Sequence, residues 1–202
     1  MTLSASIVGV LLAGGRAQRM GGDKGRRMLG GRTLLDRAIE RARPQVLALA
    51  LNVHDDPDRF GNLDLPVVTD SIPNHAGPLA GILAGMDWAR SLDARWLASF
   101  PIDAPFFPSD LVSRLAEAVI KDTAEIAYAA SGRRTHPVFG LWRVSLAEEL
   151  RRALTIEGVR KVDAWSARHR VSVVTFDSAP ADPFLNVNTP EDLAAAERLL
   201  VS

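Results

Sequence analysis

Glycines and basic side chains gather in one short stretch, LLAGGRAQRMGGDKG, at residues 11–25. This stretch directly follows an apolar run and contains Arg16, Arg19 and Lys24. Glycine costs backbone entropy, so a glycine-rich stretch indicates either a tight turn or a ligand that must approach backbone N–H groups closely. Backbone amides with nearby cations can surround a polyphosphate. The stretch therefore predicts a phosphate-binding loop, with a solvated surface loop as the alternative.

Two common phosphate-binding motifs do not fit this loop. The P-loop pattern GxxxxGK[ST] requires a glycine where Met20 stands, and Lys24 is followed by Gly25 rather than by Ser or Thr. The dinucleotide pattern GxGxxG requires a glycine where Arg16 stands.

The chain has 24 basic residues, of which only three are lysines, so Lys24 is an unusual choice here. A compact ammonium charge suits the bridging region of a triphosphate.

Carboxylates and amides follow other strand-like segments. Asp103 comes after WLASFPI and lies between two prolines that restrict its backbone, where a carboxylate suits Mg²⁺. Asp70 follows LPVVT, and Asn186 and Asn188 are two residues apart, so on an extended segment they would face the same side. The alternative for each of these residues is a role in a local turn. His136, before a proline, is interpreted as structural and is left out of the site.

Short apolar runs alternate with helical patterns along the chain. The strand-like runs span 6–13, 46–53, 65–70, 95–103, 124–130, 136–142 and 171–176. The helical patterns span 33–42, 77–90, 109–120, 145–154, 158–169 and 188–201, with cap signals at Thr33 and Thr189. This alternation predicts a single α/β domain over 1–202, a Rossmann-like fold with a mostly parallel twisted sheet flanked by helices. Ligands of such sheets bind beyond the carboxyl ends of the strands, where the glycine loop, Asp70 and Asp103 all fall.

Composition excludes several classes of protein. The 202 residues carry no net formal charge, so nothing global favours nucleic acid or a membrane surface. The absence of cysteine excludes disulfides, thiolate metal sites and cysteine nucleophiles. The N-terminus makes a poor signal peptide, and no apolar stretch approaches the roughly 20 residues of a membrane helix. We therefore expect a cytoplasmic protein.

Several segments in order resemble one family. The loop matches the form LAGGxxxRMGxDK of the α/β nucleotidyltransferases. Within that superfamily the chain resembles the molybdenum cofactor guanylyltransferases, and the segments that carry this resemblance span nearly the whole chain: NV at 52–53, VVTDSIPNHAGPLAGI at 67–82, FPIDAPFFPSDL at 100–111, HPVFGLW at 136–142 and FLNVNTPEDL at 184–193. Arg26 and Arg27 depart from the family, which more often has apolar residues there.

The resemblance implies a reaction between GTP and molybdopterin, or Mo-molybdopterin, that forms the guanine dinucleotide cofactor and releases pyrophosphate. The implied metal is Mg²⁺, with Mn²⁺ as the alternative. The implied partners are GTP, molybdopterin and proteins of molybdoenzyme maturation or cofactor insertion, with no nucleic acid and no membrane. Phosphoryl-type transfer depends mostly on positioning and charge stabilisation, so no protein nucleophile is needed.

The resemblance also implies roles for single residues. The nucleotide-binding positions are Leu12, Ala13, Gly14, Gly15, Lys24, Asn52, Asp70 and Asp103. Lys24, Arg19 and Asp103 are implied to be catalytic, with Asp103 as the metal ligand. Asn186 and Asn188 are implied to lie near the second substrate or the metal.

Two alternatives remain at this stage. The first is a related nucleotidyltransferase that uses CTP or activates a sugar or alditol phosphate, although LAGG and the GPLAG element at 77–81 favour guanine. The second is a catalytically silent nucleotide-binding or cofactor-delivery module on the same fold. The presence of both Lys24 and Asp103 favours an enzyme, because a pure binding protein would not need both.

Overall fold

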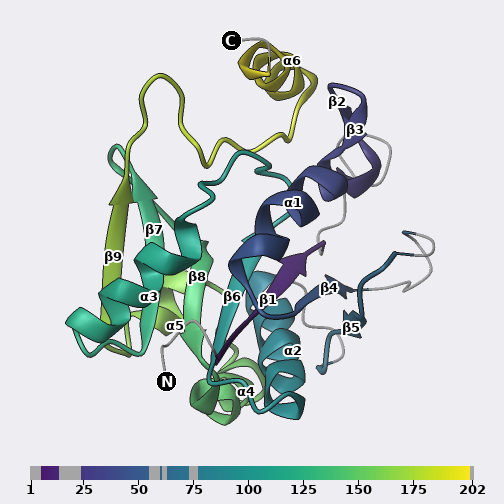
Figure 1. Cartoon of the computed structure of the whole chain (residues 1–202). Helices are drawn as coiled ribbons and strands as arrows, with labels where there is room; N and C mark the ends of the chain where they lie inside the picture. Colours follow the sequence, from purple (N-terminus) through teal and green to yellow (C-terminus); the bar gives the residue numbers. More distant parts are fainter. Residues whose placement is uncertain (1–5, 14–23, 55–59, 61–62, 73–76, 201–202) are drawn as a thin grey trace.

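The structure is a computed structural model that describes residues 6–13, 24–54, 60, 63–72 and 77–200. Its described elements form one seven-stranded sheet between two layers of helices (Figure 1). Among these residues, no helix has the length and apolar character that crossing a membrane requires.

The sheet has the strand order β5-β4-β1-β6-β8-β7-β9. Its strands are β1 (Ile7–Leu12), β4 (Leu49–Val53), β5 (Val67–Thr69), β6 (Trp96–Pro101), β7 (Ile126–Ser131), β8 (Arg134–Arg143) and β9 (Val171–Phe176). The strands β5, β4, β1 and β6 are parallel neighbours, and β9 pairs in parallel with β7. The prediction of one α/β domain with a mostly parallel sheet is confirmed.

The strand β8 is the exception, because it runs antiparallel to both β6 and β7. Ser131 pairs with Arg134, so only two residues connect β7 to β8. Gly132, the first of them, has φ 54°, which suits such a tight turn. A parallel pair would need a crossover of a dozen or more residues, so this short connection fixes the antiparallel direction.

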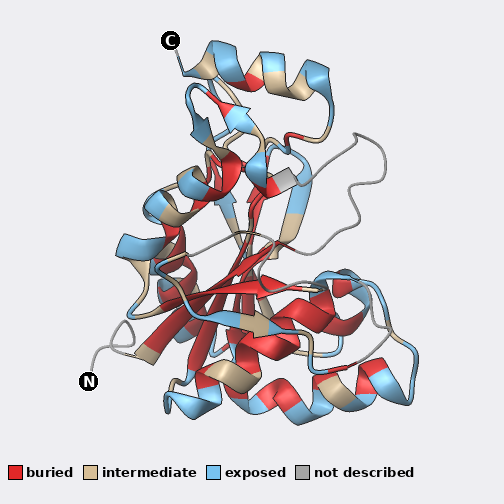
Figure 2. Cartoon of the chain, turned by 90° about the vertical axis from the view of Figure 1, so that its right-hand side faces the viewer, coloured by how far each residue is buried: buried red, intermediate tan, exposed pale blue. Residues whose placement is uncertain are grey.

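Two hydrophobic cores lie on opposite faces of the sheet (Figure 2). The helices α1 (Leu34–Ala42) and α3 (Leu111–Lys121) cover one face. The other face is covered by α2 (Pro78–Ser91), α4 (Ala147–Thr155) and α5 (Val162–Ser166). Burial on both faces explains why β1 reads as a continuous apolar run.

A third, smaller core joins the last helix to the segment that follows the glycine loop. The helix α6 (Pro190–Leu199) packs near the short hairpin of β2 (Met28–Leu29) and β3 (Arg32–Thr33). The buried residues of this core are Leu29, Leu34, Val187 and Ala196. Sequence patterns did not predict this hairpin, since two-residue strands are too short to show a period.

Both predicted helix caps are confirmed. Thr33 and Asp36 form a capping box at the start of α1, although Glu or Gln is more usual than Asp at the third helical position. Thr189 and Asp192 form the same arrangement at the start of α6, with Pro190 at the first helical position.

Several predicted ranges are longer than the observed elements, and the structure gives a reason for two of them. The helix expected over 158–169 is only Val162–Ser166, because Gly158 has φ 68° and the chain before Val162 is extended. The strand expected over 46–53 begins only at Leu49, after the 3₁₀-turn η3 (Arg43–Gln45). Two other 3₁₀-turns are η2 (Lys24–Arg26) and η5 (Val144–Leu146).

Candidate active site

The site predicted from the sequence lies where the strand order reverses. From β1 the chain first adds β4 and β5 on one side, and then returns to place β6 on the other side of β1. The carboxyl ends of these four parallel strands therefore share one edge of the sheet. In open α/β sheets this reversal leaves a crevice in which ligands bind.

Main-chain hydrogen bonds join three segments at this edge. The N–H of Ala13 donates to the carbonyl of Asn52 at 3.0 Å, and the N–H of Ile102 donates to the carbonyl of Leu12 at 3.5 Å. The end of β1 therefore lies between the end of β4 and the turn that carries Asp103. Leu12 and Ala13 are both buried.

Other predicted residues of the glycine loop fall outside the described part of the chain. These residues are Gly14, Gly15 and Arg19. The backbone of Lys24 begins η2, while its side chain is not described. Their predicted contacts with the nucleotide stay predictions.

Asn52 and Asp70 are brought together from adjacent strands. The Asn52 amide nitrogen donates to Asp70 Oδ1 at 2.9 Å and to the Val68 carbonyl at 3.2 Å. These two bonds use both hydrogens of the amide, so they fix the orientation of a side chain that is almost fully buried. The second oxygen of Asp70 lies 2.7 Å from His54 Nδ1.

His54 is a contact that sequence reasoning missed. A carboxylate oxygen only accepts, so the Nδ1 atom of His54 carries the hydrogen that it donates to Asp70. The two-residue spacing of Asn52 and His54 on an extended segment is the signal that could have found it, because such residues face the same side.

Gly81 in the first turns of α2 leaves room for the Asn52 amide. A Cβ atom at this position would lie 2.3 Å from Asn52 Oδ1 and 2.8 Å from Leu12 Cδ2. The glycine of the GPLAG element therefore allows the helix to approach Asn52 closely. The helix begins at Pro78 after Gly77, whose φ of 138° lies in the region that favours glycine.

Asp103 lies in the turn after β6 and is half-buried. Its carbonyl accepts a hydrogen bond from the N–H of Val187 at 2.6 Å, which brings the segment with Asn186 and Asn188 to the same edge. Asn186 is exposed, and Asn188 is half-buried with its backbone N–H bound to the Asp192 carboxylate.

The donor set around Asp103 is compatible with a hard cation that keeps other ligands. Within the described ranges there is no group of three His, Cys, Asp or Glu residues that could hold a metal. Mg²⁺ commonly binds through one or two carboxylates together with substrate phosphates and water. The described residues around Asp103 therefore offer the small carboxylate set that Mg²⁺ accepts and do not form a cage of protein ligands.

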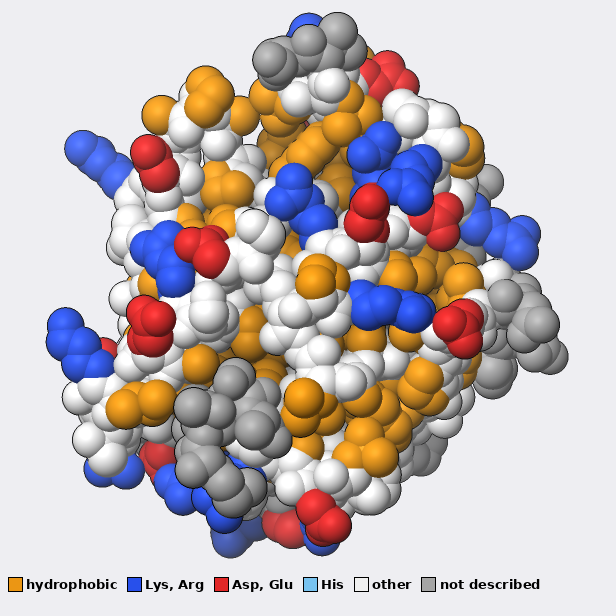
Figure 3. Space-filling view, viewed as in Figure 1, with side chains coloured by type: hydrophobic (Ala, Val, Ile, Leu, Met, Phe, Trp, Pro, Cys, Tyr) orange, Lys and Arg blue, Asp and Glu red, His pale blue; other side chains and the backbone are white. Residues whose placement is uncertain are grey.

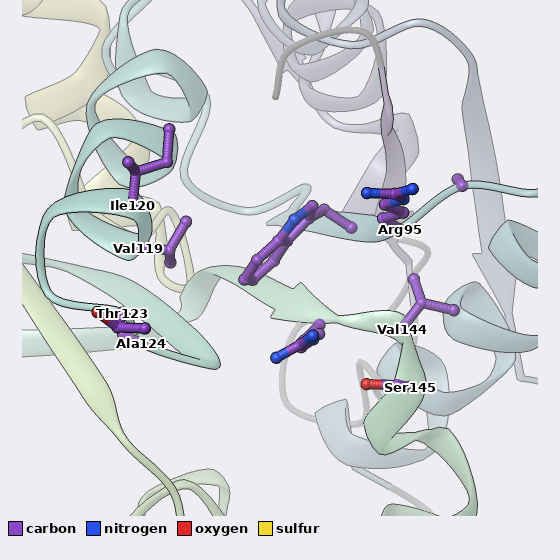
Figure 4. A pocket seen from close by; sticks show the side chains of 10 residues that line it. Arg95, Val119, Ile120, Thr123, Ala124, Val144 and Ser145 are labelled. Atoms are coloured by element: carbon purple, nitrogen blue, oxygen red, sulfur yellow. The ribbon is translucent and has the colours of Figure 1, made fainter. Parts of the chain in front are cut away.

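A cavity of about 590 Å³ lies at the opposite edge of the sheet (Figure 4). Its lining includes Arg95 and Trp96 at the start of β6, whereas Asp103 follows the end of that strand. The cavity is therefore separate from the predicted site. On the face seen in Figure 3, basic and acidic side chains of the described residues are interspersed, in line with the zero net charge.

Comparisons with known proteins agree with this architecture. The model of the MobA-like NTP transferase domain family matches residues 9–172. A molybdenum cofactor guanylyltransferase of Bradyrhizobium sp. strain ORS 278 is 52% identical over 199 residues, which cover 97% of this chain and 94% of that protein.

Two solved structures show the same fold at lower identity. Molybdopterin-guanine dinucleotide biosynthesis protein A from Archaeoglobus fulgidus has a TM-score of 0.77 and 24% identity, covering 96% of this chain and 98% of its own. A manganese complex of a Mycobacterium tuberculosis protein has a TM-score of 0.68 and 20% identity, covering 96% and 98%. The sequence identity to the first relative, over nearly the full length of both proteins, decides the family. The chain belongs to the molybdenum cofactor guanylyltransferase family and carries its MobA-like NTP transferase domain.

Proposed function

We propose that this nucleotidyltransferase transfers GMP from GTP to the phosphate of molybdopterin, or of Mo-molybdopterin. A phosphate oxygen of the acceptor attacks the α-phosphorus of GTP, the bond from that phosphorus to the bridging oxygen breaks, and pyrophosphate leaves. The products are the guanine dinucleotide form of the cofactor and pyrophosphate. The observation that carries the proposal is the 52% identity, over 97% of the chain, to a protein named molybdenum cofactor guanylyltransferase.

The geometry supports a nucleotide site at the end of β1. We assign the main chain of Leu12, Ala13, Gly14 and Gly15 to the nucleotide, with Lys24 and Arg19 neutralising its phosphates. Asn52 and Asp70 would hold the base or ribose. The close packing of Asn52 between Asp70 and Gly81 supports this assignment, because a rigid amide–carboxylate pair can select among bases.

The acceptor would bind on the other side of the α-phosphate, near Asn186 and Asn188. Asp103 lies between the two sides, since the turn that carries it is hydrogen-bonded to Leu12 and to Val187. Asp103 would hold Mg²⁺, with Mn²⁺ as the alternative. Such an ion, when bound, neutralises charge on the phosphates.

We also infer a cytoplasmic location and a transfer of the product to proteins of molybdoenzyme maturation or cofactor insertion. Neither nucleic acid nor a membrane is needed for the proposed reaction.

A nucleotide panel tests the proposed reaction. The purified chain is incubated with Mg²⁺ and GTP, CTP, ATP or UTP, with and without molybdopterin, and pyrophosphate release and the dinucleotide product are measured. We expect GTP to be favoured by about 10⁴, since a wrong base leaves buried polar groups without partners. Equal turnover of CTP and GTP would identify a cytidylyltransferase instead. Nucleotide binding without transfer would indicate the silent binding module.

A further inference from the structure

Ser131, His136 and Asp182 form a hydrogen-bonded cluster at the carboxyl end of β7. The Ser131 hydroxyl donates to Asp182 Oδ1 at 2.8 Å and lies 2.7 Å from His136 Nε2. Ser131 is 2% exposed, so this hydroxyl has little access to water. The sequence interpretation of His136 as structural did not include these partners.

The cluster has a defined donor direction. Asp182 Oδ1 accepts from the Ser131 hydroxyl and from the backbone N–H of Phe184 at 2.9 Å. Serine has one hydroxyl hydrogen, which is already used, so His136 Nε2 must donate to the Ser131 oxygen. The geometry therefore selects the form of the ring that carries a hydrogen on Nε2.

Burial favours the neutral form of the His136 ring. Desolvation is the largest cause that lowers its pKa below the ordinary value, nearby Asp182 opposes this shift, and Arg134 adds to it. A neutral ring with its hydrogen on Nε2 satisfies the Ser131 oxygen, so the cluster needs no charge on His136.

Asp182 begins the segment that carries the two asparagines. The other end of this segment is held at Val187, whose N–H donates to the carbonyl of Asp103 at 2.6 Å. Between these two points Phe184 is buried, and its ring stacks on His136 with 4.7 Å between ring centroids. Phe184 also contacts Phe139, at 4.9 Å between ring centroids. The segment is therefore fixed at both ends and in its middle.

We propose that Ser131, His136 and Asp182 are positioning residues that hold the 182–188 segment, and with it Asn186 and Asn188, in register with the Asp103 turn. The consequence rests on the proposed function: the cluster would align the acceptor phosphate with the nucleotide. Misplacing a reacting group by about 1 Å can cost up to about 100-fold in rate. Loss of the cluster should therefore weaken use of molybdopterin, while GTP, which binds at β1, should be affected little.

A matched pair of His136 variants separates positioning from packing. His136→Gln places its amide nitrogen near the position of Nε2 and keeps a donor to Ser131, whereas His136→Asn places its amide nearer Nδ1. Both variants lose the ring that stacks on Phe184. Ser131→Ala removes the central hydroxyl. The kcat and KM for molybdopterin, the KM for GTP and the amide hydrogen exchange of 184–188 are measured on each full-length variant.

We expect Ser131→Ala and His136→Asn to lower kcat/KM for molybdopterin at least about tenfold and to speed exchange of the Phe184 and Val187 amides, with KM for GTP changed less than about twofold. His136→Gln should stay near the wild type in both. Equal losses in the two His136 variants, or unchanged exchange in Ser131→Ala, would overturn the proposal.

Hydrogen exchange keeps this inference separate from the proposed reaction. If the wild type transfers no guanylyl group to molybdopterin, the proposed function fails. Faster exchange at Phe184 and Val187 in Ser131→Ala would then still support the positioning role, and unchanged exchange would refute it.

Discussion

Replacing Gly81 by alanine tests whether the contact between α2 and Asn52 organises the nucleotide side of the site. The new Cβ atom would lie 2.3 Å from Asn52 Oδ1, well inside contact distance. The Asn52 amide cannot move aside freely, because its nitrogen is bound to both Asp70 and the Val68 carbonyl. The substitution should therefore break at least the bond to Asp70.

The expected change in the free energy of unfolding is the sum of two destabilising contributions and one stabilising contribution. A hydrogen bond to a charged group contributes about 1.5–3 kcal/mol, and one to a carbonyl about 1 kcal/mol. Alanine gains about 1 kcal/mol over glycine in a helix. We therefore expect Gly81→Ala to lower the free energy of unfolding by about 2 kcal/mol and to weaken GTP binding about tenfold, measured by urea unfolding and by titration calorimetry.

Two controls make this prediction specific. In the Asn52→Ala background the clash with the amide is gone and only the contact with the flexible end of Leu12, at 2.8 Å, remains, so Gly81→Ala should cost far less, with a coupling free energy of about 2 kcal/mol. Gly85→Ala, one turn further along α2, would meet apolar atoms of Val10 and Leu97 at 2.9 Å and should lower stability without changing GTP affinity. A Gly81→Ala protein that is as stable as the wild type and binds GTP normally would refute the reasoning.

Three further predictions concern charged residues. Lys24→Ala should slow guanylyl transfer by raising its activation free energy by about 2–4 kcal/mol, because it removes a charge-assisted contact to the phosphates. The Tm should change little. Asp103→Asn should fold normally, since its backbone rather than its side chain binds Val187, and should lose nearly all transfer even in excess Mg²⁺ while GTP affinity falls only modestly. Backbone N–H groups at 188 and 189 hold the pKa of Asp192 below its ordinary value, so its contribution to stability is present above about pH 4 and is lost as the pH falls through the lowered pKa. Asp192→Asn should flatten this acid dependence of unfolding.

Matched variants define what would contradict these three. Lys121→Ala at the end of α3 and Asp93→Asn just before β6 remove the same charges at the opposite edge of the sheet and should leave transfer unchanged. A Lys24→Ala protein that unfolds early but keeps its turnover per folded molecule would show that the lysine is structural. Full activity of Asp103→Asn at ordinary Mg²⁺ would show that Asp103 is not the metal ligand and would favour Asn186 or Asn188 in that role. If the stability of Asp192→Asn falls with decreasing pH as steeply as that of the wild type, the Asp192 carboxylate does not stabilise the start of α6.

Local patterns in the sequence were enough for much of the fold. The apolar run of β1 and the capping boxes at Thr33 and Thr189 depend on neighbouring residues, so a linear sequence displays them directly. The α/β class followed from the alternation of such segments. The family followed from motifs that recur in order along the chain, and their match to relatives confirms it.

The tertiary structure alone decided which side chains meet. Asn52 and Asp70 are 18 residues apart, and Ser131 and Asp182 are 51 residues apart, yet each pair shares a hydrogen bond. Hydrophobic periodicity reports which face of a segment is buried, but it does not report which strand will lie beside it. The antiparallel direction of β8 and the contact of His54 with Asp70 depend on that pairing. The sequence by itself therefore determined the fold class and the family, whereas strand order and the close approach of Gly81 to Asn52 determined how the site is assembled.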